Sequence, residues 1–241
     1  MSDATIEPRS VLITGGNRGI GRAIAEEFVR RGDRVTVTSR SGKGGPEGAL
    51  TVPAEVTDGE SLDAAIKAAE DAHGPIEVLV ANAGVTDDQL LLRMSDDSFE
   101  TVLDTNLSGS FRVVKRVIKS MMRKKKGRIV LVGSVVGLYG SPGQVNYAAS
   151  KSGLVGIARA ITRELGSRGI TANVIAPGYV DTEMTAALAD EVQAGYKKAI
   201  PAGRFAAPEE IARVAAFIAS DDAAYISGAV IPVDGGLGMG H

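Results

Sequence analysis

Residues 10–21, Ser-Val-Leu-Ile-Thr-Gly-Gly-Asn-Arg-Gly-Ile-Gly, pass from a strand through a glycine-rich turn into a helix. The first five are apolar or β-branched, as in a buried strand, and the helix carries an apolar stripe that ends at Gly32. The turn has the spacing Gly-x-x-x-Gly-x-Gly, which lets the backbone approach a pyrophosphate at the helix N-terminus. The alternative is a plain tight turn, and the position at the first strand–helix junction favours phosphate binding.

Strands and helices continue to alternate along the chain. Further strands are expected over 34–39, 50–56, 77–81, 128–133, 171–176 and 230–233, and further helices near 57–73, 95–121, 146–165, 184–196 and 208–219. Glycines and Pro142 predict a loop over 135–145. Without repeats or linkers, the pattern predicts one domain over 1–241 with a flexible segment at 1–9. Its fold class is α/β: a Rossmann-type doubly wound parallel sheet of about seven strands with helices on both faces.

Composition excludes several kinds of site. The chain has 241 residues, a net charge of −2, no cysteine and two histidines. The small charge argues against general attraction to nucleic acid or anionic membranes. The lack of cysteine rules out disulfides and thiolate chemistry, and two histidines make a metal site or a Ser-His-Asp triad improbable. With neither an apolar run of membrane-spanning length nor a signal sequence, we expect a cytoplasmic protein.

The end of the second expected strand indicates which dinucleotide would bind. Ser39 and Arg40 stand where an acidic residue would take the ribose 2′-hydroxyl of NAD, and Arg18 lies in the glycine turn. Two guanidinium groups suit a 2′-phosphate. The sequence therefore favours NADP, the alternative being two ordinary surface arginines.

Candidate acid–base residues follow the strand at 128–133. Ser134 lies at its end, and Tyr147 and Lys151 are four residues apart at the start of a helix, so they share one face. A nearby ammonium favours the tyrosinate and should lower the tyrosine pKa toward neutrality, as a general acid or base requires. Taken alone, the pair is equally compatible with a packing tyrosine beside a solvated lysine.

Asn106 interrupts the apolar stripe of the long helix expected at 95–121. A buried amide needs partners. It would suit the ordering of a water or a backbone kink, or it is a satisfied structural asparagine.

These segments together resemble the short-chain dehydrogenase/reductases. The matching motifs are Thr14-Gly15-x-x-x-Gly19-Ile20-Gly21, Asn82-Ala83-Gly84, Asn106, Ser134, Tyr147-x-x-x-Lys151 and Pro177-Gly178, in order from residue 10 onward. Within the family, further segments around Leu91–Met94, Gly127–Val130 and Pro201–Arg204 are most similar to bacterial reductases of 3-oxoacyl groups on acyl carrier protein.

The resemblance implies a role for each motif. Tyr147 would protonate the developing alkoxide, Lys151 would hold the nicotinamide ribose, Ser134 would hold the carbonyl oxygen, and Asn106 would anchor a relay water. The implied cofactor is NADPH/NADP, held by Thr14, Gly15, Asn17, Arg18, Gly19, Ile20, Gly21, Ser39, Arg40, Glu55, Val56, Asn82, Ala83, Gly84, Tyr147, Lys151, Pro177, Gly178, Val180 and Thr182. Glu55 departs from the usual aspartate, which puts its adenine contact in question.

The implied activity is the NADPH-dependent reduction of a 3-oxoacyl thioester in fatty-acid synthesis, by a homotetramer. Acyl carrier protein is the implied partner, and Arg128 and Arg168 are the candidate docking cations, which could equally be helix-end or surface charges. Two alternatives remain open: a reductase of acyl-CoA or another small ketone, and a non-catalytic dinucleotide sensor on the same fold.

Overall fold

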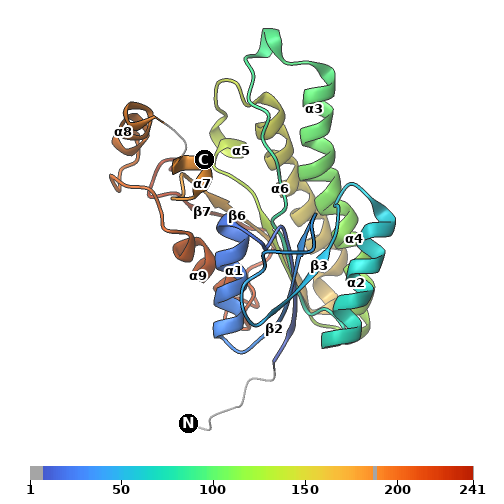
Figure 1. Ribbon diagram of the computed structural model, residues 1–241. Coiled ribbons are helices and arrows are strands. Elements are labelled where there is room, and N and C mark those ends of the chain that lie inside the picture. Colours follow the sequence, from blue (N-terminus) through green and yellow to red (C-terminus); the bar gives the residue numbers. More distant parts are fainter. Residues whose placement is uncertain (1–7, 187–188, 241) are drawn as a thin grey trace.

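The computed structural model describes residues 8–186 and 189–240. Its seven strands form one sheet in the order β3-β2-β1-β4-β5-β6-β7 (Figure 1). All neighbouring strands are parallel. The strands are β1 Ser10–Thr14, β2 Arg34–Ser39, β3 Ala49–Pro53, β4 Val78–Ala81, β5 Gly127–Val132, β6 Ile170–Pro177 and β7 Val230–Val233. The predicted single-domain α/β fold is confirmed.

Helices cover both faces of this sheet (Figure 1). They are α1 Gly19–Arg30, α2 Gly59–His73, α3 Asp96–Leu103, α4 Gly109–Lys124, α5 Val136–Tyr139, α6 Val145–Leu165, α7 Glu183–Ala186, α8 Asp190–Ala199 and α9 Pro208–Ile218. Three short turns complete them: η1 Leu91–Arg93, η2 Asp104–Ser108 and η3 Gly166–Arg168. One core cluster joins α1 and α9 to the sheet, and a second joins α2, α4 and α6 to the other face.

The strands are buried on both faces because their side chains alternate between the two cores. In β1, Val11 and Ile13 belong to the cluster under α1, and Leu12 belongs to the cluster under α2 and α4. All three are at most 1% exposed. Such two-sided burial explains the continuous apolar runs of the sequence.

The strand order reverses beside β1, which pairs with β2 on one side and β4 on the other. Open parallel sheets bind ligands outside the carboxyl ends of their strands at such a reversal. The glycine turn after β1, residues 82–84 after β4 and Ser134 after β5 all lie at this edge. The fold thus gathers segments that are far apart in sequence.

Local structure differs from the sequence-based expectation at several points. The long helix expected at 95–121 contains a π-helical turn, η2, around Asn106. The loop expected at 135–145 begins with the short helix α5, and β3 stops three residues before the expected end at Val56. The helix expected at 184–196 is split into α7 and α8, and residues 187–188 between them lie outside the described part of the chain.

Arg9 departs from the flexible N-terminal segment expected over 1–9. Its guanidinium pairs with Asp33 at 2.7 Å and donates to the carbonyl of Ala219 at 2.5 Å. The other end of the expected segment, residues 1–7, lies outside the described residues.

Arg128 contradicts the expectation of an exposed docking cation. It is 7% exposed at the amino end of β5. Its guanidinium donates to the carbonyls of Gly127 at 3.0 Å, Gly169 at 3.2 Å and Ser220 at 3.3 Å, and to Asp221 at 3.0 Å. Arg128 is therefore part of the fold, where its buried guanidinium is satisfied by three carbonyls and a carboxylate.

We predict that Arg128→Ala lowers the free energy of unfolding by roughly 2–4 kcal/mol, because four hydrogen bonds made by one buried guanidinium are lost together. Arg168→Ala is the matched control. Arg168 is an exposed arginine at the same end of the molecule, and its loss should change stability by less than about 0.5 kcal/mol. Chemical denaturation of both variants measures the difference, and equal stabilities would contradict a structural role for Arg128.

Candidate active site

The glycine turn forms the floor of the site at the N-terminus of α1. Gly19 has a φ of +51°, a conformation that disfavours other residues, and an added Cβ there would meet only the Thr182 methyl group, at 3.8 Å. A Cβ at Gly21 would lie 2.3 Å from both the Asn82 amide nitrogen and the Gly15 carbonyl oxygen. Glycine at position 21 lets the first turn of α1 pack closely against Asn82. Glycine at position 19 leaves the end of the helix open.

Thr14 and Asn82 hold this turn in place. The Thr14 hydroxyl accepts the N–H groups of Asn82 and Ala83, each at 3.0 Å. The Asn82 amide donates to the carbonyls of Thr14 at 3.0 Å and Gly15 at 3.1 Å. Both residues are predicted cofactor ligands, and their side chains shape the binding turn from behind.

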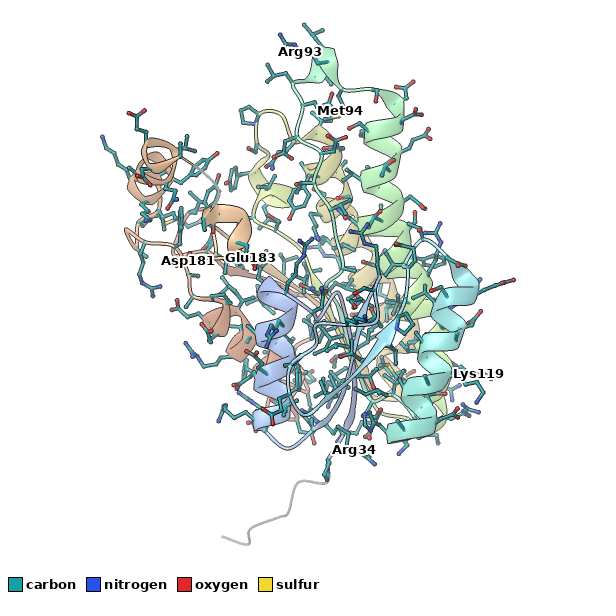
Figure 2. All side chains as sticks on the ribbon, viewed as in Figure 1. Arg34, Arg93, Met94, Lys119, Asp181 and Glu183 are labelled. Atoms are coloured by element: carbon teal, nitrogen blue, oxygen red, sulfur yellow. The ribbon has the colours of Figure 1, made fainter. Side chains whose placement is uncertain are left out.

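These residues fit a dinucleotide phosphate. The first N–H groups of a helix have no partner within the helix, and together with the helix dipole they form an anion site. Arg18, which precedes α1, is exposed, and its side chain makes no cap to the helix. Figure 2 shows Asp181 and Glu183 near this end of α1, in agreement with the 3.8 Å between the Thr182 methyl group and a Cβ placed on Gly19. The segment after β6, with Pro177, Gly178, Val180 and Thr182, thus borders the same site.

Positive charge gathers where the second strand ends. Arg40 is exposed, as are Arg18 and Lys43, and among the described residues none of the three forms an ion pair. The Ser39 hydroxyl is occupied within this turn, because its Oγ donates to the Lys43 carbonyl at 2.9 Å and accepts the Lys43 N–H at 3.1 Å. Ser39 therefore shapes the turn that carries Arg40 and Lys43.

Asn17, Glu55 and Val56 lie farther along this edge. The Asn17 Cβ is 3.5 Å from the Cβ position of Gly44, so the loop after β2 folds against the glycine turn. Val56 is 5% exposed and packs against Gly109 of α4. Glu55 is half-buried, and its N–H donates to Ser61 at 3.0 Å. The contact of its carboxylate with adenine stays a prediction.

Tyr147 and Ser134 face each other across the end of β5. A hydrogen bond from Ser134 lowers the pKa of the Tyr147 phenol, although burial, the larger effect, raises it. Asp88 raises it further. The expectation that Lys151 brings this pKa down toward neutrality is wrong for this structure: the net direction is upward, because the phenol is removed from water. The phenol thus holds its proton, and its role as the acid stays a prediction.

Lys151 lies one helical turn after Tyr147. Its ammonium is 5.5 Å from the centre of the Tyr147 ring, and it donates to the Val132 carbonyl at 2.8 Å. Lys151 is 6% exposed, and burial lowers its pKa to about 8. The Cβ position of Gly84 lies 3.5 Å from Nζ, so the lysine fronts the segment after β4. The predicted Tyr147, Lys151 and Ser134 therefore come together, next to the phosphate turn.

Asn106 is fully buried within η2. Its Oδ1 accepts the Val85 N–H at 2.8 Å, and its Nδ2 donates to the Val85 carbonyl at 3.0 Å and to Ser150 Oγ at 3.1 Å. Of the possibilities considered, the structure shows a π-helical turn at this point, and the Asn106 amide has hydrogen-bond partners. Because these bonds occupy the amide, the relay water implied by resemblance stays a prediction.

Comparison with known proteins agrees with this geometry. A family model described as Enoyl-(Acyl carrier protein) reductase matches residues 15–238. The chain is 54% identical to the 3-oxoacyl-[acyl-carrier-protein] reductase MabA of Mycobacterium tuberculosis, over 97% of this chain and 94% of the relative. It is 45% identical to the 3-oxoacyl-[acyl-carrier-protein] reductase FabG of Escherichia coli K12, over 97% of this chain and 98% of the relative. The chain belongs to the short-chain dehydrogenase/reductases.

Membership of this family implies a nicotinamide dinucleotide cofactor. The phosphate turn and the buried lysine beside Gly84 fit such a cofactor. Among the residues that the structure describes, no helix has both the length and the apolar character of a membrane span.

Several residues of this short-chain dehydrogenase/reductase site are not evident from its motifs. Burial and a hydrogen bond with Tyr196 raise the pKa of Tyr179. The charge of Asp88 adds to this rise, as it does at Tyr147. The rings of Tyr179 and Tyr196 stack with centroids 4.2 Å apart, which ties α8 to the segment after β6. Asn146 is a further buried amide of the site. In the sequence only its position directly before Tyr147 draws attention to it.

Lys151→Met should stabilise the cofactor-free protein, and the gain should depend on pH. The folded-state pKa of about 8 lies below the ordinary 10.5, so burial of the charge costs roughly 3 kcal/mol at low pH. Below pH 8 this cost is present in full. As pH rises toward 10.5 the folded protein loses the proton first, and the cost disappears.

Thermal unfolding of both proteins between pH 6.5 and 10 checks this, because contributions that do not vary with pH cancel from the trend. The advantage of the variant should shrink on going up the series. A constant or growing advantage would show that Lys151 is not buried as a cation.

Proposed function

We propose that this protein reduces 3-oxoacyl thioesters carried on acyl carrier protein to 3-hydroxyacyl thioesters, with NADPH as cofactor. The observation that carries the proposal is Tyr147, placed against Ser134 and one turn before Lys151 at the edge where the dinucleotide turn lies. The names of relatives at 45–54% identity supply the substrate class. Bound NADPH would supply the hydride.

The chain's own residues would position the carbonyl and supply the proton. The Ser134 and Tyr147 hydroxyls both reach the place for a carbonyl oxygen and would donate hydrogen bonds to it, which stabilises negative charge as it develops. Tyr147 would then give up its proton to that oxygen. The Lys151 ammonium, held by the Val132 carbonyl, would offset part of the cost of leaving a phenolate in this buried site.

The cofactor would lie along the edge of the sheet. The N-terminus of α1 would hold its pyrophosphate, Lys151 its nicotinamide ribose, and Arg18 and Arg40, with Lys43, its 2′-phosphate. The other predicted cofactor residues, from Glu55 along the chain to Thr182, would line the edge on which the cofactor lies.

The partner belongs to the same proposal. Arg128 is excluded as a docking cation by its burial. Arg168 is exposed, but it lies at the C-terminal end of α6, about 30 Å from Tyr147 at the helix rise of about 1.5 Å per residue. The proposed carrier therefore rests on the relatives' names. The homotetramer rests on the family resemblance and the cytoplasmic location on the sequence alone, and both stay predictions. Purified carrier-bound and small 3-oxoacyl thioesters, compared as substrates at increasing salt, distinguish a charged carrier from a small substrate, since exposed charges are screened.

Arg40→Ala should weaken NADPH binding roughly ten- to a hundred-fold and leave NADH binding nearly unchanged, because a charge-assisted hydrogen bond contributes about 1.5–3 kcal/mol. Fluorescence titration with each nucleotide measures both affinities. Arg30→Ala, at the other end of α1, is the control for the loss of one exposed arginine. A wild-type protein that binds and uses NADPH and NADH equally would remove the basis for an NADP assignment.

Tyr147→Phe should lower kcat for an acetoacetyl thioester by more than about ten-fold while NADPH affinity stays within about two-fold, since the hydroxyl acts on the substrate and general acid catalysis contributes at least that much. Steady-state rates and nucleotide titration on the same preparation separate the two effects. If the variant kept more than a tenth of the wild-type kcat, Tyr147 would not be the proton donor. No turnover by wild type with any oxo thioester would instead favour a dinucleotide sensor.

A further inference from the structure

Asn146 lies directly before the proposed proton donor and is 0% exposed. Its Oδ1 accepts the N–H of Tyr147 at 2.7 Å. Its Nδ2 donates to the Asp87 carbonyl at 2.9 Å and to Ser98 Oγ at 3.4 Å. One buried amide thus joins the first turn of α6 to the loop after β4 and to α3.

Ser98 extends this connection to a charged group. It is 7% exposed, and its own N–H donates to Ser95 Oγ at 3.1 Å. A hydrogen bond from Ser98 holds the pKa of the Asp87 carboxyl below its usual value. The Ser98 hydroxyl therefore donates to Asp87 and accepts from Asn146, and the direction of every bond in the connection is fixed.

The two loops that meet here are joined at further points. The Gln89 N–H donates to the Gly143 carbonyl at 2.9 Å, and the Gln144 amide donates to Asp88 at 2.8 Å. The loop after β4 continues to Arg93 and Met94 at the tip of the molecule (Figure 2). The segment entering α6 is thus held along residues 143–146 by residues 87–89.

We propose that Asn146 is a positioning residue: through Ser98 and the Asp87 carbonyl it fixes the first turn of α6, and with it the place of the Tyr147 hydroxyl opposite Ser134. The proposal rests on the reductase function proposed above. A tyrosine hydroxyl stands at the end of a long side chain, so a small rotation of the first turn moves it farther than it moves the backbone. Catalysis is sensitive to displacements of about 1 Å, which can lower a rate by on the order of a hundred-fold.

A purely structural asparagine is the competing explanation. Loss of a structural residue lowers stability, and the rate falls in the same proportion whether or not the tyrosine hydroxyl is present. A positioning residue acts through that hydroxyl alone. The two explanations therefore differ in how the effects of two substitutions combine.

The decisive experiment is a double-mutant cycle with Asn146→Ala and Tyr147→Phe, measured as single-turnover reduction of an acetoacetyl thioester by NADPH-saturated enzyme. Asn146→Ala should slow the step by about ten-fold or more in the wild-type background, with the thioester KM and the NADPH affinity little changed. In the Tyr147→Phe background it should slow the residual rate no further. Equal slowing in both backgrounds overturns the proposal.

Ser98→Ala tests the same connection in a protein whose Asn146 is intact, in case Asn146→Ala does not fold. It removes one of the two acceptors of the Asn146 amide and the hydroxyl that donates to Asp87. Ser95→Ala is the matched control, since it removes the cap of α3 and leaves the Asn146 bonds in place. Ser98→Ala should lower kcat several-fold more than Ser95→Ala at equal thermal stability, and equal kcat values would overturn the proposal.

A measurement that needs no turnover separates this proposal from the reductase function. In hydrogen–deuterium exchange, Asn146→Ala should speed exchange in peptides covering both 85–90 and 143–150, whereas Ser95→Ala should affect only the start of α3. Faster exchange at both loops in a protein that reduces no thioester would refute the function and leave the connection standing. Unchanged exchange at 85–90 would refute the connection, whatever the activity.

Discussion

The hydrogen bonds between Thr14 and Asn82 are the junction on which the site depends. They join the ends of β1 and β4, the two strands beside which the strand order reverses. The same amide reaches the Gly15 carbonyl and so fixes the backbone of the glycine turn. Without this junction the end of α1 would not open toward the carboxyl ends of β4 and β5, and phosphate binding and acid–base chemistry would not share one edge.

The acid–base residues are costly groups to bury, and their neighbours offset that cost. Lys151 keeps only a carbonyl oxygen as a partner among the described residues, and its lowered pKa expresses the loss of water. Tyr147 is shielded in the same way, and its raised pKa has the same origin. Nearby, Asn106 and Ser150 are completely buried but fully bonded, so the polar shell around the pair adds no unpartnered group. The site therefore places two partly desolvated polar groups, Tyr147 and Lys151, within a hydrogen-bonded shell, as preorganised catalysis requires.

Local patterns in the sequence were sufficient for the fold and for placing Tyr147 and Lys151 side by side. Apolar runs and glycine spacing are properties of neighbouring residues, and four-residue spacing places Tyr147 and Lys151 on one helix face. Burial is not a local property. The sequence could not show that Arg128 meets carbonyls up to 92 residues away, or that the amide of Asn146 meets Asp87 across 59 positions. The predicted direction of the Tyr147 pKa shift was wrong for the same reason. The sequence shows that a lysine lies nearby, but it does not show that the phenol loses contact with water.

The hydrophobic core sets the orientation of α6, the helix that carries Tyr147 and Lys151. Ser150, Leu154 and Ala158 follow one another along a single buried stripe of α6, each at most 1% exposed. Each residue of an α-helix turns by about 100°, so a slip of one residue would carry Leu154 out of the core at a cost of about 1.5–3 kcal/mol. The same slip would turn Lys151 away from the Val132 carbonyl. Apolar packing of Leu154 and Ala158 thus restrains rotation of α6 about its axis, and the Asn146 connection restrains it at the first turn. The position of the Tyr147 hydroxyl follows from both.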